Sequence, residues 1–331
     1  MITASHFGFL RKVRRPVVLA AGFFDGVHRG HQKVLNLAVA RAAALGGQAW
    51  ALTFARHPLR VLAPAMAPRL LTTTPQRLSI LERLGLDGCL LLPFTRPLAR
   101  LEPEAFLDRL LRGIPTLTEV VVGANWRFGR GGRGDVSLLI RMGAQCGLRV
   151  IVAQPAKCGK KIISSTRIRQ AVSAGQLSLA NAMLGRPFSI VGRVVRGRRL
   201  GRRLGCPTAN IIPESEVLPP FGVYAVWGVL HRKIFDGVAN YGLRPTVSKD
   251  RRRAELELHL FDFAGNLYER AIEVFLVSKL REERRYTSLE SLRRQITADV
   301  RRARRILRGS KKLKESLYTL GFVDYIACRE K

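Results

Sequence analysis

Short apolar runs alternate with amphipathic segments through the first half of this 331-residue chain, and no other feature limits its fold so strongly. Five of these runs predict buried strands, at residues 17–21, 48–54, 88–94, 119–123 and 148–153. The first strand is expected to begin at about Pro16, after a short basic extension. Helical patterns lie between the runs, at 32–45, 75–85 and 103–113. This alternation predicts a doubly wound parallel sheet.

The pattern changes near Gly185, Arg186 and Pro187. Beyond them, closely spaced β-type runs are separated by Gly, Pro and Asn turns, at 188–197, 222–230, 234–242, 254–263 and 271–280. These runs predict a small antiparallel β-barrel. A helix over about 288–308, with apolar residues at helical spacing, is expected to close it. We therefore expect two domains, residues 1–185 and 186–331.

The chain is strongly basic, with 57 Lys and Arg against 24 Asp and Glu and a formal net charge of +33. Such a balance is typical of proteins that bind nucleic acid. The basic residues are mostly Arg, however, and they spread along the whole chain without the interleaved aromatic residues of a stacking platform. We therefore do not expect nucleic acid to be a partner. A basic nucleic-acid-binding protein on a retired enzyme scaffold stays open as an alternative.

The cysteines and the apolar runs indicate the compartment. Five cysteines are scattered along the chain and none forms a CxxC pair, which argues against structural zinc and against a disulfide framework. No apolar run approaches the roughly 20 residues that a membrane span requires. We therefore expect a cytoplasmic protein with no membrane partner.

The stretch GFFDGVHRGH, residues 22–31, joins the first predicted strand to a predicted helix. Its glycines allow close approach of a ligand, and the helix that follows offers unpaired N–H groups to an anion. His28 and His31 can both donate to phosphate oxygens as negative charge builds. Zinc binding by this pair lacks both an HExxH pattern and a third ligand nearby. Two ordinary surface histidines would explain neither the glycines nor the position after a strand. The stretch therefore predicts a phosphate site.

The HxGH of this stretch is similar to the signature of the nucleotidylyltransferase superfamily. The longer GFFDGVHRGHQ resembles the adenylyltransferase module of bacterial bifunctional riboflavin kinase/FAD synthetases. TFARHP (53–58), VVGANWRFGRGGRGD (121–135) and ISSTRIR (163–169) resemble further motifs of that module, in the same order. In isolation, SSTRIR would read as an ordinary helix cap. The resemblance implies a Rossmann-like domain that transfers AMP from ATP to FMN.

The resemblance also assigns roles to residues of this domain. It makes His28 and His31 catalytic. The residues that it implies for ATP and its phosphates are Gly22, Phe24, Asp25, Gly26, Gly30, Ser165, Thr166 and Arg169. On the flavin or nucleotide side of the cleft it implies His57, Asn125 and Arg127.

The second half resembles the riboflavin kinase module of the same family, beginning with LGRPFSIVGRVVRGRRLGRRLGCPTANI (184–211). Gly197, Gly201 and Gly205 recur every four residues in a segment too charged for a membrane helix interface, which favours a flap over phosphates. Thr208 and Asn210 of PTAN can offer oxygens to a Mg²⁺ ion that bridges ATP phosphates. In isolation, PTAN would read as a turn.

Three later segments extend this resemblance: GVANYGLRPTV (237–247), ELELHLFDF (255–263) and the closing segment 280–304. Strand alternation places Glu255, Glu257 and His259 on one face, opposite three leucines. The resemblance implies that Glu257 is the catalytic base and that Arg281 lies on the flavin side of the site.

The chain departs from the family pattern at three positions. Cys206 replaces the usual Phe before PTAN, Arg56 replaces a Pro, and Glu269 stands where Gly is common. The sequence as a whole predicts a bifunctional enzyme that uses ATP and Mg²⁺ to convert riboflavin to FMN and then FMN to FAD. A nucleotidylyltransferase with a different acceptor stays open as an alternative.

Overall fold

The computed structural model describes residues 1–195, 206–230, 233–245 and 252–319. The chain forms two compact units, Met1–Ser165 and Thr166–Lys331. The domain boundary expected between residues 185 and 186 stays a prediction. Gly197, Gly201 and Gly205, the expected phosphate flap, lie outside the described residues.

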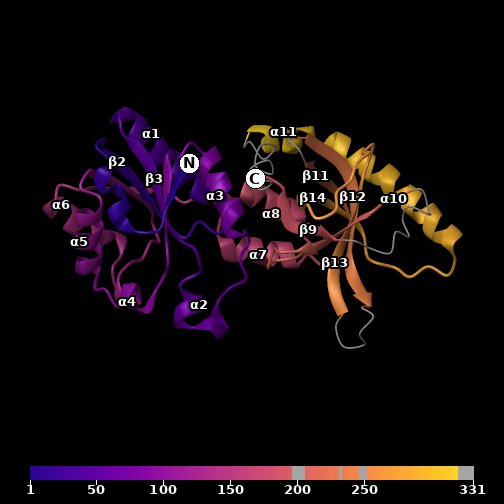
Figure 1. Ribbon diagram of the computed structural model, residues 1–331, viewed down its shortest axis with the longest axis horizontal. Coiled ribbons are helices and arrows are strands. Elements are labelled where there is room, and N and C mark those ends of the chain that lie inside the picture. The colour runs from indigo at the N-terminus through magenta and orange to yellow at the C-terminus, as the bar shows by residue number, and fades with distance from the viewer. Residues whose placement is uncertain (196–205, 231–232, 246–251, 320–331) are drawn as a thin grey trace. The chain divides into compact units, whose positions relative to one another are not determined.

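The first unit is built on a six-stranded parallel sheet with the order β1-β4-β3-β2-β5-β6 (Figure 1). Its strands are β1 (Ile2–Ala4), β2 (Val17–Ala21), β3 (Gln48–Phe54), β4 (Gly88–Leu92), β5 (Leu117–Gly123) and β6 (Arg149–Ala153). Its helices are η1 (Phe7–Lys12), α1 (Arg29–Ala44), α2 (Leu59–Leu62), η2 (Pro64–Met66), α3 (Thr74–Arg83), α4 (Arg96–Ala99), α5 (Pro103–Gly113), η3 (Arg130–Gly132) and α6 (Val136–Gln145). The predicted doubly wound parallel sheet is confirmed.

The structure corrects the sequence prediction at two strands. The first strand is β1, paired in parallel with β4, so the expectation that the sheet begins at Pro16 was wrong. Three residues are too few to show a strand period. Strand β4 ends at Leu92, two residues earlier than predicted, because Pro93 has no N–H to donate to a neighbouring strand.

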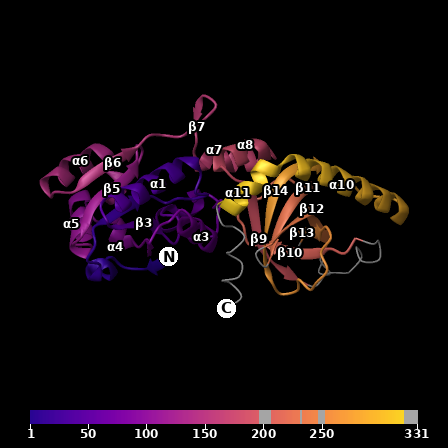
Figure 2. The same cartoon turned by 90° about the horizontal axis from the view of Figure 1, so that it is seen from above.

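Both faces of this sheet are covered, which explains why its strands are uniformly apolar. One face packs against α5 and η1 in a single cluster that includes Leu19, Trp50, Leu90 and Val120. Helix α1 contacts β2, β3 and β5 and buries Leu35 completely. Beyond β6, a short hairpin of β7 (Lys157–Cys158) and β8 (Lys161–Ile162) projects from the unit (Figure 2).

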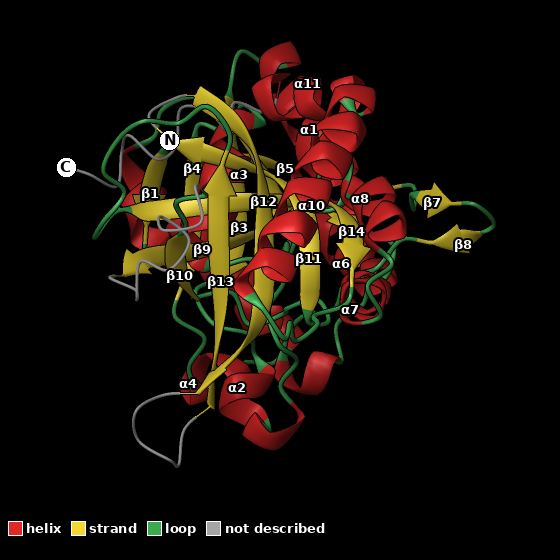
Figure 3. Ribbon diagram, turned by 90° about the vertical axis from the view of Figure 1, so that its right-hand side faces the viewer, coloured by secondary structure: helices red, strands yellow, loops and turns green. Residues whose placement is uncertain are grey.

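The second unit contains a closed six-stranded antiparallel barrel, preceded by α7 (Ser165–Ser173) and α8 (Leu177–Leu184) (Figure 3). Around the barrel, the order is β10-β13-β12-β11-β14-β9. The strands are β9 (Phe188–Val195), β10 (Ala209–Pro213), β11 (Gly222–Leu230), β12 (Lys233–Pro245), β13 (Arg252–Leu260) and β14 (Ala271–Arg281). The predicted barrel is confirmed, with one strand more than the five runs expected. The additional strand, β10, begins within PTAN, whose Pro and Asn are typical of turns.

Helix α10 (Leu289–Gly309) lies across the outside of the barrel, in contact with β11, β12 and β14 (Figure 3), and α11 (Lys311–Thr319) follows it. The buried residues of α10, which are Asp299, Ala303 and Leu307, are spaced by about one helical turn. Asp299 receives hydrogen bonds from Nε and Nη2 of Arg281, at 3.0 and 2.8 Å. The predicted closing helix is therefore confirmed, and a buried ion pair anchors it. Among the helices that the structure describes, none combines the length and apolar character of a membrane span.

Glu269, which stands where the resemblance leads us to expect Gly, adopts a positive φ of 65°. Only Gly reaches this left-handed region without steric cost. The backbone conformation therefore explains why Gly is common at this position.

The anchoring pair yields a stability prediction. Asp299→Asn leaves the Arg281 guanidinium without its carboxylate partner, and the two side chains are only 7% and 16% exposed. We expect the free energy of unfolding to fall by about 3 kcal/mol, measured by chemical denaturation. Asp262→Asn is the matched control, because Asp262 also pairs with an arginine of α10 but is 79% exposed. Equal losses in the two variants would contradict the prediction.

Candidate active sites

The first candidate site lies where the connections of the parallel sheet change direction. Strand β2 pairs with β3 on one side and with β5 on the other. The segments that follow β2 and β5 therefore leave the carboxyl edge on either side of a topological switch point, where α/β proteins bind ligands. Those segments carry GFFDGVHRGH and the loop with Asn125 and Arg127. Both of these loop residues are exposed.

The turn after β2 has a strained backbone. Phe24, Gly26 and Val27 have φ angles of 55°, 79° and 38°. A β-branched residue such as Val27 rarely adopts a positive φ, and each such residue costs about 1–3 kcal/mol. Strain of this size persists only where neighbouring contacts hold it, and it is common at functional sites.

The Asp25 carboxylate is one of these contacts. Asp25 is buried, and its Oδ1 accepts hydrogen bonds from the N–H groups of Leu71 and Thr72 at 2.9 and 3.2 Å. The Gly26 N–H in turn donates to the Thr72 hydroxyl at 3.1 Å. Asp25 thus ties the strained turn to the segment before α3.

His28 and His31 lie together in this turn. Their rings stack with centroids 3.6 Å apart, and His28 is the N-cap of α1. The N–H of His31 donates to Nδ1 of His28 at 3.3 Å, which places the proton of neutral His28 on Nε2. The nearest atoms to a Cβ built on Gly30 would be those of the His28 ring, at 3.1 Å, so a side chain there would crowd this histidine. The turn therefore presents two imidazoles at the start of a helix.

His57 lies after β3 and is linked to the same turn. Its ring meets that of Phe23 edge-on, with centroids 4.7 Å apart. Its Nδ1 accepts a hydrogen bond from the Leu59 N–H at 3.1 Å, which leaves Nε2 as the donor of the neutral ring. Arg56, the departure beside it, is exposed.

Arg77 stabilises this region through its guanidinium group. The sequence analysis did not identify it. It lies on α3, is 1% exposed, and donates to the carbonyl oxygens of Phe23 and Phe54 at 3.0 and 2.6 Å. Burial lowers the pKa of its guanidinium, and the Asp25 carboxylate raises it. Arg77 therefore fixes the ends of β2 and β3. In the sequence it looks like an ordinary solvated residue of an amphipathic helix.

Ser165 connects ISSTRIR to the same turn across 140 residues of sequence. It begins α7, and its hydroxyl donates to the backbone oxygen of Asp25 at 2.9 Å. The structure therefore places Ser165, the last residue of the first unit, beside the turn. Thr166 and Arg169 follow on α7, within the second compact unit.

The second candidate site lies on the barrel. Glu257 on β13 is in register with Asn210 on β10 and with Asn240 on β12. Residues directly opposite on neighbouring strands point to the same face, with Cβ atoms about 5 Å apart. Leu256 and Leu258 are buried, so Glu257 lies on the opposite face to these leucines, as the alternation predicted. The predicted base therefore stands between two amide side chains.

Asn210 has the property expected of a metal ligand. Its Oδ1 is inaccessible to solvent and has no hydrogen-bond partner among the described residues. Thr208 lies two residues earlier, directly before β10 begins at Ala209. The hydrogen bond between His259 Nδ1 and the Pro207 oxygen, 2.8 Å long, ties this segment to the strand of Glu257. Cys206 before it is half-buried, and burial raises the pKa of its thiol.

Arg281 lies at the other end of the same row of residues. Val223 on β11 pairs with Asn240 on one side and with Arg281 on β14 on the other. The Arg281 guanidinium is largely used to hold Asp299 of α10. Asn240 was missed in the sequence, although the segment GVANYGLRPTV that contains it was recognised.

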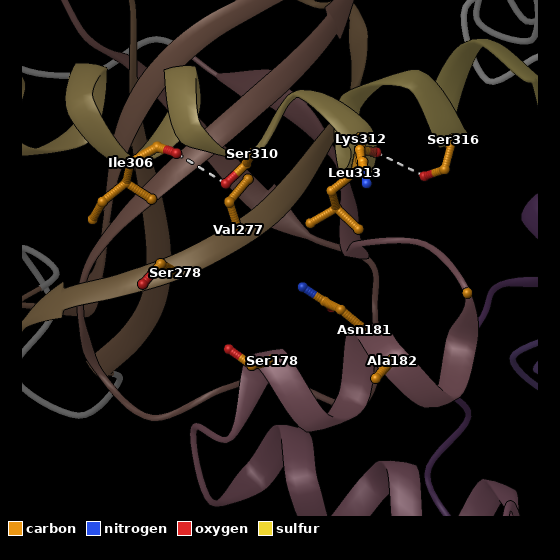
Figure 4. A pocket seen from close by; sticks show the side chains of 11 residues that line it. Ser178, Asn181, Ala182, Val277, Ser278, Ile306, Ser310, Lys312, Leu313 and Ser316 are labelled. Carbon is orange, nitrogen blue, oxygen red and sulfur yellow. Dashed lines mark hydrogen bonds between the residues drawn. The ribbon is translucent and has the colours of Figure 1, made fainter. Parts of the chain in front are cut away.

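A separate cleft of about 620 Å³ lies between α8, β14, the end of α10 and α11 (Figure 4). Its lining includes Ser178, Asn181, Ser278 and Ser316, and none of the predicted site residues. Asn181 is engaged within the fold, because its Oδ1 accepts from the Phe188 N–H at 2.8 Å. The cleft therefore has no part in either candidate site.

Family models match both halves of the chain. A model for FAD synthetase matches residues 10–167, and a model for riboflavin kinase matches residues 184–307. A bifunctional riboflavin kinase/FMN adenylyltransferase of Pseudomonas fluorescens is 40% identical over 295 residues, covering 89% of this chain and 94% of the relative. The chain belongs to this bifunctional family. His28, Asn125 and Ser165 fall in the first matched segment, and Asn210, Glu257 and Arg281 in the second.

Other relatives extend the likeness. The bifunctional riboflavin kinase/FMN adenylyltransferase of Escherichia coli K12 is 41% identical over 288 residues, covering 87% of this chain and 91% of that protein. A crystal structure of a Streptococcus pneumoniae protein, described as a macrolide-efflux protein, superposes with a TM-score of 0.81 at 27% identity. The match covers 92% of this chain and 99% of that protein.

Arg77 gives a prediction for the first site. Arg77→Met removes the hydrogen bonds to the oxygens of Phe23 and Phe54, so we expect the free energy of unfolding to fall by about 2–4 kcal/mol. Amide hydrogen exchange should accelerate in residues 22–28, because the turn loses its support. Arg141→Met on the exposed face of α6 is the control and should change neither measurement. Unchanged exchange in the Arg77 variant would show that the turn holds its conformation without this residue.

Proposed function

We propose that this chain phosphorylates riboflavin to FMN with ATP and then transfers AMP from a second ATP to FMN, giving FAD and pyrophosphate. One observation carries the proposal. Two chemically different sets of side chains lie in two compact units: imidazoles at the start of a helix, and a carboxylate between amides on a barrel strand. Each set suits one of the two reactions that the relatives' names describe.

In the kinase reaction, the terminal ribityl oxygen attacks the γ-phosphorus of ATP. The bond from that phosphorus to the bridging oxygen breaks, and ADP leaves. Glu257 accepts the hydroxyl proton. Its position beside Asn210, in strand register, supports this role because the base and the phosphate-side residue then share one face.

Mg²⁺ would be held by Thr208 and Asn210. The buried, unpartnered Oδ1 of Asn210 fits a hard cation, which prefers oxygen ligands. When bound, the ion would offset the negative charge of the ATP phosphates. Both of these ligands are neutral, and we assign Glu257 the role of base and not that of a ligand.

In the adenylyl reaction, a phosphate oxygen of FMN attacks the α-phosphorus of ATP and pyrophosphate leaves, so no protein nucleophile is needed. His28 and His31 would donate hydrogen bonds to phosphate oxygens as their negative charge increases. Neutral His28 carries its proton on Nε2, because its Nδ1 accepts from the His31 N–H. Gly22, Gly26 and Gly30 would allow close approach of the phosphates, and Ser165, Thr166 and Arg169 would bind them.

Four other predicted site residues would shape or border the two sites. Asp25 accepts two backbone N–H groups, so we propose that it shapes the phosphate turn. Phe24 is buried with its ring edge-on to His31 and would position that imidazole. His57 meets Phe23 of the same turn edge-on and would border the nucleotide. Arg281 would set the flavin side by holding α10 in place.

We further propose that the enzyme works in the cytoplasm with small-molecule partners. Cys89, Cys146, Cys158 and Cys206 are free thiols, which suits a reducing compartment. Asn125 and Arg127 on the exposed loop after β5 would contact the nucleotide or the flavin. We assign no nucleic acid partner to the basic surface, because its arginines spread along the chain.

The two sites should be separable by mutation. Glu257→Gln keeps the side-chain shape but removes the base, so we expect riboflavin phosphorylation to be lost while added FMN is still converted to FAD. His28→Ala combined with His31→Ala should let FMN accumulate without FAD, with a rate loss of at least about 10²–10³-fold. Chromatography of the flavins after incubation with ATP and Mg²⁺ measures both.

Matched controls exist for each variant. Glu255→Gln changes the same functional group two residues earlier on the same strand face, and His6→Ala removes an exposed histidine of the first unit. Both should keep both activities. Loss of both activities in either test variant, with circular dichroism unchanged, would contradict the two-site proposal. Adenylylation of an acceptor other than FMN in preference to it would instead favour a different transferase.

A further inference from the structure

We propose that Asn240 binds the ribityl chain of riboflavin and thereby sets the terminal hydroxyl against Glu257. This inference rests on the proposed kinase function and names the residue that recognises its polyol substrate. Asn240 lies on β12 directly opposite Glu257 of β13, so the two side chains share one face of the barrel wall.

The side-chain atom of Asn240 that lacks a hydrogen-bond partner among the described residues is its oxygen, which is an acceptor. Its Oδ1 is inaccessible to solvent and has no hydrogen-bond partner among the described residues, whereas its Nδ2 faces Oε1 of Glu283 at 3.4 Å. The carboxylate can only accept, so it fixes the amide with nitrogen toward Glu283. A buried acceptor without a donor is costly, and a substrate that supplies a donor relieves that cost. A substrate that binds here should therefore carry a hydroxyl or N–H group as a donor.

Gly242 makes this orientation possible. A Cβ built at Gly242 would collide with the Glu283 carboxylate, so the absence of a side chain lets Glu283 approach β12. The carboxylate can then reach the amide nitrogen of Asn240 from the segment before α10. Gly242 and Glu283 thus keep the Asn240 oxygen directed away from them.

The order of residues across the barrel distinguishes the two amides that flank the base. From β10 to β14 the row reads Asn210, Glu257, Asn240, Val223 and Arg281. Asn210 and Thr208 lie on the side proposed for Mg²⁺ and the phosphates. Asn240 lies on the other side of Glu257, toward Arg281. Phosphoryl transfer needs the nucleophile and the leaving group on opposite sides of the phosphorus. The hydroxyl-bearing substrate therefore belongs beside Asn240.

A ribityl chain matches this position chemically. Its inner hydroxyls are donors placed at fixed distances from the terminal hydroxyl that reacts. A hydrogen bond from one inner hydroxyl to Asn240 Oδ1 orients the chain and brings the terminal hydroxyl within reach of Glu257. A site built to hydrogen-bond a hydroxyl also rejects analogues that lack it, so Asn240 contributes to specificity.

A double-mutant cycle between protein and substrate tests this inference. Wild type and Asn240→Leu are each assayed for kinase activity with riboflavin and with three analogues, each lacking one inner ribityl hydroxyl. We expect Asn240→Leu to raise the KM for riboflavin about tenfold, with the KM for ATP unchanged. With one of the analogues the two proteins should become equal, because the partner of Asn240 is already absent.

Other outcomes overturn the inference. An equal penalty of Asn240→Leu on riboflavin and all three analogues means that Asn240 does not contact the chain. A raised Mg²⁺ requirement without a change in the KM for riboflavin would make Asn240 a metal-side residue. Asn240→Ser replaces the leucine variant if thermal unfolding shows that the latter is misfolded. Asn266→Leu, on the exposed loop before β14, is the control for the substitution itself. A wild type that cannot phosphorylate riboflavin refutes the proposed function instead.

Discussion

The pairing of β13 with its two neighbours is the constraint on which the kinase site depends. Side chains alternate along a strand, so a slip of one residue would turn Glu257 into the barrel and bring leucines out. The complete burial of Leu256 and the near-complete burial of Leu258 oppose that slip, because it would expose both of them to water. The apolar core of the barrel thus fixes the position of the carboxylate that we propose as the base, although this carboxylate lies outside the core. The same register sets Asn210 and Asn240 on either side of Glu257.

The site on the parallel sheet is held in a different way. Its key turn has an unfavourable backbone at Phe24 and Val27, and polar contacts from distant parts of the chain hold it. The segment before α3 binds the Asp25 carboxylate, and the first residue of α7 binds the Asp25 carbonyl oxygen. Arg77 donates hydrogen bonds to the backbone just after β2 and at the end of β3. The energy stored in the turn is therefore offset by hydrogen bonds within the first unit.

The sequence predicts most of the fold, because strand and helix periods are local properties. Five strands of the sheet and five of the barrel follow from their apolar patterns, while β1 is too short and β10 is disguised by turn residues. His28 is also visible, because two histidines in one glycine-rich turn are unusual, and Glu257 is visible through the resemblance of its segment to the kinase module. Arg77 and Asn240 are not visible. Their roles depend on burial and cross-strand register, which only the folded chain defines.

One chain carries out two successive ATP-dependent reactions on a flavin. The most direct measurement incubates the wild-type protein with riboflavin, Mg²⁺ and ATP, radiolabelled in parallel reactions on the γ- or the α-phosphate. We expect FMN to carry only the γ label, and FAD to carry the γ label and the α label in equal amounts. Label from the α-phosphate in FMN, or FAD that lacks either label, would contradict it.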